Sequence, residues 1–230
     1  MIAALLAHTE SASAADPTVT GGIGSVTSVY AGISLTLQSE TEWLTAETAI
    51  HVRDTFFNTY PDECALFNPN CPRAVTIVIK PSLIPCPNDK TMAPGCAGGT
   101  SIAVAGDWLW YYPQDYDLVT HEAMHIVQGY TRAGDCPYWV EGVADVARAW
   151  FGKNNVAAGW RLVPGNSVLD GTRQSAHFLD WVAYAYGRNV IVNLDQTLRA
   201  SGCPGDDFWI AQTRLSGQML WDQYVSTRGG

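Results

Sequence analysis

Residues 120–128 read Thr-His-Glu-Ala-Met-His-Ile-Val-Gln, and this segment decides which fold the chain is expected to adopt. It contains the pattern HExxH within a stretch that has no Pro or Gly. Because an α-helix turns by about 100° per residue, His121 and His125 lie on one face and can bind the same metal ion. Glu122 lies beside that face, within reach of a water molecule at the metal. The spacing therefore predicts a zinc ion on the two histidines, with Glu122 as general base.

A third protein ligand is expected further along the chain. In metzincins it follows the second histidine by six residues, where this chain has Thr131, and Gln128 stands where metzincins have Gly. The segment 138–145, Tyr-Trp-Val-Glu-Gly-Val-Ala-Asp, instead resembles the gluzincin pattern. This resemblance implies that Glu141 binds zinc and that Asp145, four residues later on the same face, hydrogen-bonds a ligating histidine. The reverse order, with Asp145 on zinc, remains open.

A wider part of the chain, about residues 30–225, resembles the basic secretory protein family of plants, also called peptidases of plants and bacteria. The matching segments are residues 120–128, 139–145, 175–181 and 220–224. The resemblance implies a secreted protein with a zincin-like fold and zinc peptidase activity. Two features depart from the family: the chain is acidic, with a pI of about 4.8, and it carries Cys-bearing loops at about 61–73 and 81–99.

The expected reaction is hydrolysis of a peptide bond in a protein or peptide substrate. Zinc held by two histidines and Glu141 leaves a fourth position for water, and Glu122 would take the water proton and deliver it to the leaving amine. Ile102, Ala103 and Val104, in a predicted strand at 101–105, are the candidate sheet edge along which a substrate adds as a strand. Candidates for the oxyanion donor are three side chains of the helix predicted at 172–186, namely His177, Tyr184 and Tyr186.

Two other functions remain open at this point. Nine Trp and ten Tyr could stack on sugars in a non-catalytic extracellular binding module, with zinc as a purely structural ion. The motif also permits a zinc hydrolase that acts on a non-peptide amide. A fourth protein ligand that closes the zinc site would favour the binding module.

The predicted fold is α+β and zincin-like, as one domain over residues 16–230. A small twisted mixed sheet with helices forms a lobe up to about 130, a mainly helical lobe follows from 131, and the metal cleft lies between them. Ser39 and Glu42 resemble a capping box for a helix at 41–59 that stops at Pro61. The other predicted elements are strands at 33–37, 74–79 and 101–105, helices at 115–128, 138–151, 172–186 and 190–201, two short helices after 206, and loops at 17–29, 61–73 and 81–99.

Cysteine content and charge indicate a secreted protein. None of the six cysteines forms a CxxC pair, and an even number in loop-like segments favours disulfides. Proximity and elimination favour the pairs Cys64–Cys71, Cys86–Cys96 and Cys136–Cys203. Residues 1–15 resemble the end of a signal peptide or a disordered leader. A net charge of -9 disfavours nucleic acid and anionic membranes as partners, and a monomer is expected.

Overall fold

The structure is a computed structural model of the 230-residue chain. It describes residues 22, 24–42, 44–86, 92–131 and 136–227. The signal peptide or leader predicted at residues 1–15 lies outside the described residues.

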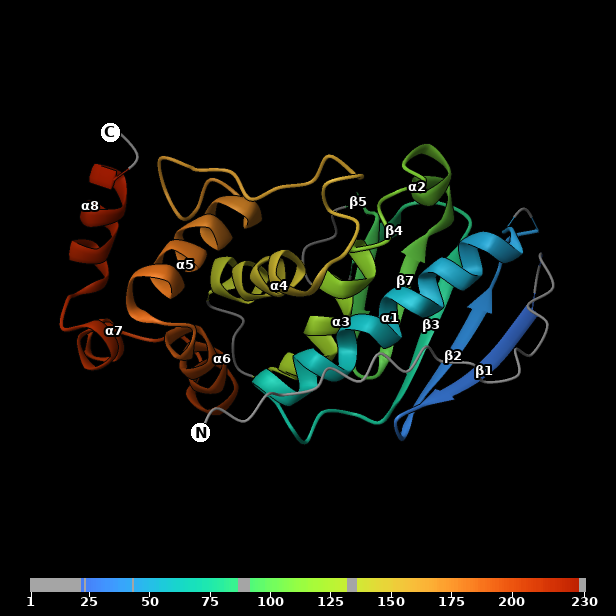
Figure 1. The fold of residues 1–230 in the computed structure, drawn as a ribbon, viewed down its shortest axis with the longest axis horizontal. Coiled ribbons are helices and arrows are strands. Elements are labelled where there is room, and N and C mark those ends of the chain that lie inside the picture. Colours follow the sequence, from blue (N-terminus) through green and yellow to red (C-terminus); the bar gives the residue numbers. More distant parts are fainter. Residues whose placement is uncertain (1–21, 23, 43, 87–91, 132–135, 228–230) are drawn as a thin grey trace, which may run out of the picture.

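A five-stranded mixed sheet forms the N-terminal part of the molecule (Figure 1). Its spatial order is β1-β2-β3-β7-β6, with both outer strands antiparallel to their neighbours and the central pairs β2–β3 and β3–β7 parallel. A separate pair, β4–β5, is antiparallel. The strand bounds are β1 Gly24–Tyr30, β2 Ile33–Ser39, β3 Ala74–Lys80, β4 Ile84–Pro85, β5 Met92–Ala93, β6 Gly95–Gly98 and β7 Ser101–Ala105.

Helices α1 (Ala46–Phe67) and α3 (Leu118–Gln128) contact each other and the sheet. Alternate side chains of β2 are buried, as expected for a strand that packs one face against helices. The inner strands are rich in β-branched residues, which pack well on a pleated surface. Core side chains of the sheet include Ile33, Leu35, Val75, Ile77, Ile79, Ile102 and Val104.

The C-terminal part is mainly helical. Figure 1 shows its helices following one another away from the sheet, with α4 nearest to α3 and α8 at the far end. The bounds are α4 Pro137–Phe151, α5 Thr172–Tyr186, α6 Asn189–Ser201, α7 Asp206–Thr213 and α8 Gly217–Thr227. A short helix, α2 (Gly106–Tyr111), follows β7 and was not predicted. The predicted α+β class, with a mixed sheet first and helices later, is therefore confirmed.

The predicted boundaries of α1 were wrong at both ends. The N-cap is Thr45, whose hydroxyl accepts from the Thr48 backbone N–H, whereas Ser39 is still in β2. The helix also continues through Pro61 to Phe67. An internal proline costs about 3 kcal/mol. The buried side chains of the last two turns, together with the disulfide at Cys64, offset that cost.

Two predicted loops contain strands. The Gly- and Ser-rich segment 17–29 includes most of β1, which forms because its backbone pairs with β2 over its whole length. The segment 81–99 includes β4, β5 and β6, and β6 pairs with β7. Short polar or Gly-bearing strands have little hydrophobic periodicity, so the pattern of the segment alone does not reveal them. They form because each pairs with the strand next to it along the chain.

The three predicted disulfides are confirmed. Cα atoms lie 5.7 Å apart in Cys64–Cys71 and 5.8 Å apart in both Cys86–Cys96 and Cys136–Cys203. The first ties the end of α1 to the segment before β3, and the second ties the residue after β4 to β6. The third joins the start of α4 to the segment after α6. Among the described residues, no helix is both long and apolar enough to cross a membrane.

Candidate metal centre

The motif helix α3 and the next helix α4 bring the predicted ligands together. His121 and His125 lie one turn apart in α3, which ends at Gly129 in the left-handed conformation (φ 52°) that favours glycine. Helix α4 begins with a proline in its first turn, directly after the disulfide-bonded Cys136. It presents Glu141 to the two histidines.

The three ligand atoms form a compact triangle. Nε2 of His121 lies 3.2 Å from Nε2 of His125, and Oε2 of Glu141 lies 3.3 Å from the first nitrogen and 3.6 Å from the second. Ligand atoms of a tetrahedral zinc ion lie about 3.3–3.4 Å from one another, because each is about 2.0–2.1 Å from the metal. The spacing of the three side chains therefore fits a zinc ion.

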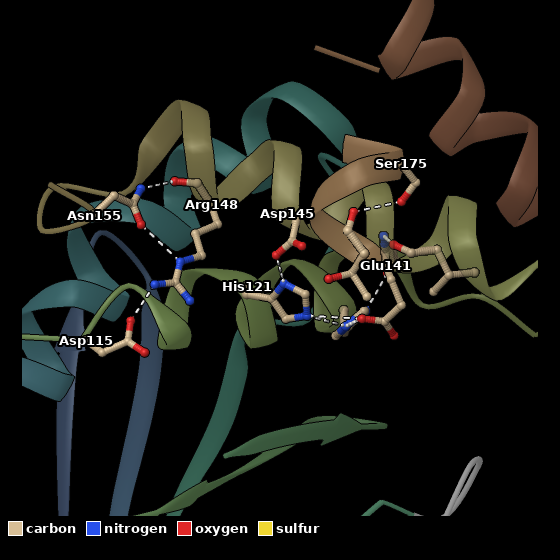
Figure 2. A network of polar contacts seen from close by, with 11 residues as sticks. Asp115, His121, Glu141, Asp145, Arg148, Asn155 and Ser175 are labelled. Atoms are coloured by element: carbon tan, nitrogen blue, oxygen red, sulfur yellow. Dashed lines mark hydrogen bonds and ion pairs between the residues drawn. The ribbon is translucent and has the colours of Figure 1, made fainter. Parts of the chain in front are cut away.

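The hydrogen bonds behind the two rings fix where their lone pairs point. Nδ1 of His121 lies 2.8 Å from a carboxylate oxygen of Asp145, a contact marked in Figure 2. Nδ1 of His125 lies 2.7 Å from Oε1 of Gln128. Both partners are acceptors, so both Nδ1 atoms carry the proton. When both rings are neutral, two imidazole lone pairs and the Glu141 carboxylate converge, and a metal cation would satisfy all three.

The charges around the histidines favour a cation as well. Burial lowers the pKa of His121, but Asp145, Glu141 and Glu122 outweigh it and raise that pKa well above its ordinary value. The pKa of His125 is likewise raised, since Glu141 and Glu122 outweigh burial and the neighbouring His121. Burial would raise the pKa of Glu141, yet the two histidines lower it far below its usual range. The centre thus places an excess of negative charge around the two histidine rings.

Asp145 occupies the position expected of a residue that orients a ligand. It contacts Nδ1 of His121, the nitrogen opposite the one in the triangle, and it is not a member of the ligand group. Arg148, three residues later in α4, pairs with Asp115, hydrogen-bonds Asn155 and is close enough to Asp145 for their charges to interact. Figure 2 shows the Asp115–Arg148–Asn155 contacts next to the separate contact between Asp145 and His121.

Glu122 is buried between α3 and the edge of the sheet. Burial raises its pKa, His121 and His125 lower it, and Glu141 and Asp145 raise it, with a net upward shift. A raised pKa would suit the general-base role predicted for Glu122. A Cβ atom on Gly95 of β6 would lie 2.5 Å from Oε1 of Glu122, so the carboxylate rests against the backbone of that strand.

Replacement of Gly95 by alanine is expected to displace Glu122 without touching a metal ligand. The added Cβ would also lie 2.8 Å from Cγ and Cδ of Glu122, which real structures do not tolerate. A displacement near 1 Å can cost about 10²-fold in rate, and we expect a loss of that order in kcat/KM for a peptide substrate. Bound zinc should stay at the wild-type level. Gly98→Ala, on the same strand with nothing within 4 Å of the new Cβ, is the matched control.

A second buried carboxyl belongs to α1, the helix that packs against α3. Glu63 of α1 is fully buried, and neither of its oxygens has a hydrogen-bond partner among the described residues. Burial raises its pKa, His121 lowers it and Asp62 raises it, so that the pKa lies well above its ordinary value. Burial therefore favours the neutral form of the Glu63 carboxyl over the ionised form.

The predicted substrate edge was wrong. Ile102, Ala103 and Val104 belong to β7, which pairs with β3 on one side and β6 on the other. The edge strand next to the motif helix is β6, at Gly95–Gly98. The sequence of β6, Gly-Cys-Ala-Gly, has no strand-like pattern. The longer β7, which contains β-branched residues, was therefore predicted as the edge instead.

The predicted oxyanion donors all lie in α5. Tyr184 is 91% exposed, Tyr186 donates its hydroxyl to Gln223, and His177 pairs with Tyr224. Gln223 and Tyr224 belong to α8, the helix farthest from the sheet (Figure 1). These contacts give the oxyanion role no support, and it stays a prediction.

Gly95, Gln128 and Arg148 support the centre but were not predicted to do so. The role of Gln128 could have been predicted from the sequence, because Gln128 lies three residues after His125 and therefore on the same helical face. Gly95 and Arg148 reach the centre only through the fold. In comparisons with known proteins, no protein-family model matches the chain and no curated protein is significantly similar to it.

Proposed function

We propose that the chain is a secreted, zinc-dependent endopeptidase of zincin-like fold, with its metal cleft between the sheet and the helical part. The observation that carries this proposal is the triangle of His121, His125 and Glu141, in which three lone-pair atoms lie at the mutual distances of tetrahedral zinc ligands. The resemblance to basic secretory proteins of plants agrees with it. The three disulfides are consistent with an oxidising compartment.

The roles of the side chains follow from their positions. Zinc would supply Lewis-acid polarisation of the scissile carbonyl and would acidify water. His121 and His125 bind through Nε2 because their Nδ1 protons are engaged by Asp145 and Gln128. Glu122, beside the triangle and with a raised pKa, accepts a proton from water and passes it to the leaving nitrogen.

The same arrangement supports a place for the substrate. An extended peptide would add to the outer edge of β6, the strand whose Gly95 touches Glu122. This position places a scissile bond close to the general base. Among the described residues the metal-ligand group has three members, which leaves a coordination position for chemistry and favours an enzyme over a purely structural zinc site.

Removal and return of zinc test the proposal. Peptide-library hydrolysis should disappear when zinc is chelated and should return when zinc is restored in a 1:1 ratio. Because zinc binds the folded state, free zinc at 1,000 times the dissociation constant should stabilise the protein by about 4 kcal/mol, measured by denaturant unfolding. Hydrolysis that persists after complete zinc removal would rule out the proposed mechanism. Zinc binding without hydrolysis of any peptide would favour the binding module.

A further inference from the structure

Gln128 connects the candidate metal centre to both of the helices that build it. It is the last residue of α3, it is 1% exposed, and it follows His125 by three residues. A buried glutamine needs partners for both ends of its amide, because an unsatisfied buried polar group costs stability. Its two partners lie on different helices.

The hydrogen-bonding partners of the Gln128 amide fix its orientation. Its Nε2 atom lies 2.8 Å from the backbone carbonyl oxygen of Val140 in α4, and that oxygen can only accept a hydrogen bond. The NH₂ group must therefore face Val140, and Oε1 must face Nδ1 of His125, at 2.7 Å. Since Oε1 accepts, Nδ1 of His125 carries the proton and its Nε2 lone pair points into the triangle.

We propose that Gln128 is a positioning residue for the metal centre, a brace that holds His125 in its ligating tautomer and fixes α3 against α4 beside Glu141. The inference rests on the proposed zinc site. Val140 immediately precedes Glu141, so a single amide sets the ring orientation of one ligand and the backbone position next to another. Partners of this kind tune metal affinity because they limit how far each ligand can rotate.

The brace is itself held in place from α6. Arg199 donates from Nε to the backbone carbonyl of Gln128 at 2.9 Å and pairs with Asp195, which also accepts from the Tyr130 hydroxyl. Asp195 is fully buried, whereas the Arg199 side chain is partly exposed. The C-terminal end of α3 is thereby fixed to a third helix, and the Gln128 side chain starts from a rigid backbone.

The two histidines are held by acceptors of different charge. His121 has the Asp145 carboxylate, whereas His125 has a neutral amide. A carboxylate accepts a stronger hydrogen bond. A carboxylate at Gln128, however, would add a fourth negative charge to Glu122, Glu141 and Asp145. The neutral amide orients His125 without that addition, and it also donates to the backbone carbonyl of Val140.

The zinc affinity of two Gln128 variants tests the brace. Zinc affinity is measured by competition with a chromophoric chelator, and peptide hydrolysis is measured on the same variants. Gln128→Met keeps the side-chain length but loses both hydrogen bonds, and we expect its zinc affinity to fall by about 10–100-fold. Gln128→Glu keeps the acceptor for His125, so its loss should be smaller than that of Gln128→Met. Gln212→Met is the matched control, because Gln212 bonds Asn193 between α7 and α6 and should leave zinc affinity unchanged.

The possible results distinguish a failure of the brace from a failure of the proposed function. A folded Gln128→Met protein that binds zinc as tightly as wild type overturns the brace while the zinc peptidase stands. A wild-type protein that binds no zinc overturns both. If Gln128→Met does not fold, ¹⁵N-histidine spectra of zinc-loaded wild type decide. A slowly exchanging Nδ1 proton on His125, as on His121, supports the brace, and rapid exchange of the His125 proton overturns it.

Discussion

Glu122→Gln is expected to abolish most peptide hydrolysis while the protein keeps its zinc. Glutamine has nearly the same shape as glutamate, so it should fit against Gly95, where the wild-type carboxylate rests. It cannot accept the proton of the attacking water. Loss of a general base costs about 10²–10⁴-fold in rate, and we expect a fall of that order in kcat with little change in KM.

The control for this result is Glu40→Gln. Glu40 is on the surface, where it pairs with Lys80, and the same chemical change there should leave hydrolysis at the wild-type rate. Zinc content of both variants is to be measured by atomic absorption. Wild-type turnover by Glu122→Gln would assign the proton transfer to another group and contradict the proposed role. Loss of zinc in this variant would show instead that the carboxylate helps to hold the metal.

Glu141→Ala is expected to weaken zinc binding far more than Asp145→Ala does. Glu141 supplies an oxygen to the triangle, whereas Asp145 contacts only the outer nitrogen of His121. Removal of an orienting partner costs about 10–100-fold in metal affinity, so Asp145→Ala should fall in this range and Glu141→Ala should exceed it. Chelator competition measures both affinities on the same scale.

This pair of variants also decides the order of the two acids. A larger loss for Asp145→Ala would assign Asp145 to the metal, the order that the sequence alone left open. Glu47→Ala serves as the control, because its side chain is 84% exposed at the start of α1. Circular dichroism of each variant separates a direct loss of ligand from a change in fold.

The sequence predicted the structure best where all residues of a motif lie in one helix. His121 and His125 are close because of helical spacing alone, and this geometry holds in any α-helix that contains them. The long amphipathic or β-branched segments were recognised for the same local reason. The disulfide pairs followed from short separations for two of them, and the third, Cys136–Cys203, followed by elimination.

Features that depend on pairing or packing between separate elements could not be predicted in this way. β6 has no strand signal of its own and becomes the edge strand only because it pairs with β7. Helix α1 passes Pro61 because its later turns are buried against other elements. Local propensity is worth at most a few kcal/mol, and tertiary packing can outweigh it.

The sequence by itself therefore determined the α+β class and the ligand pair on α3, since both depend on periodicity along one segment. The tertiary structure decided which acid of α4 completes the triangle, which strand forms the edge, and that Gln128 faces His125 and Val140 at once. Those features are distances between separate elements. They are fixed by how side chains pack between helices and sheet. The order of residues along one element carries no information on that packing.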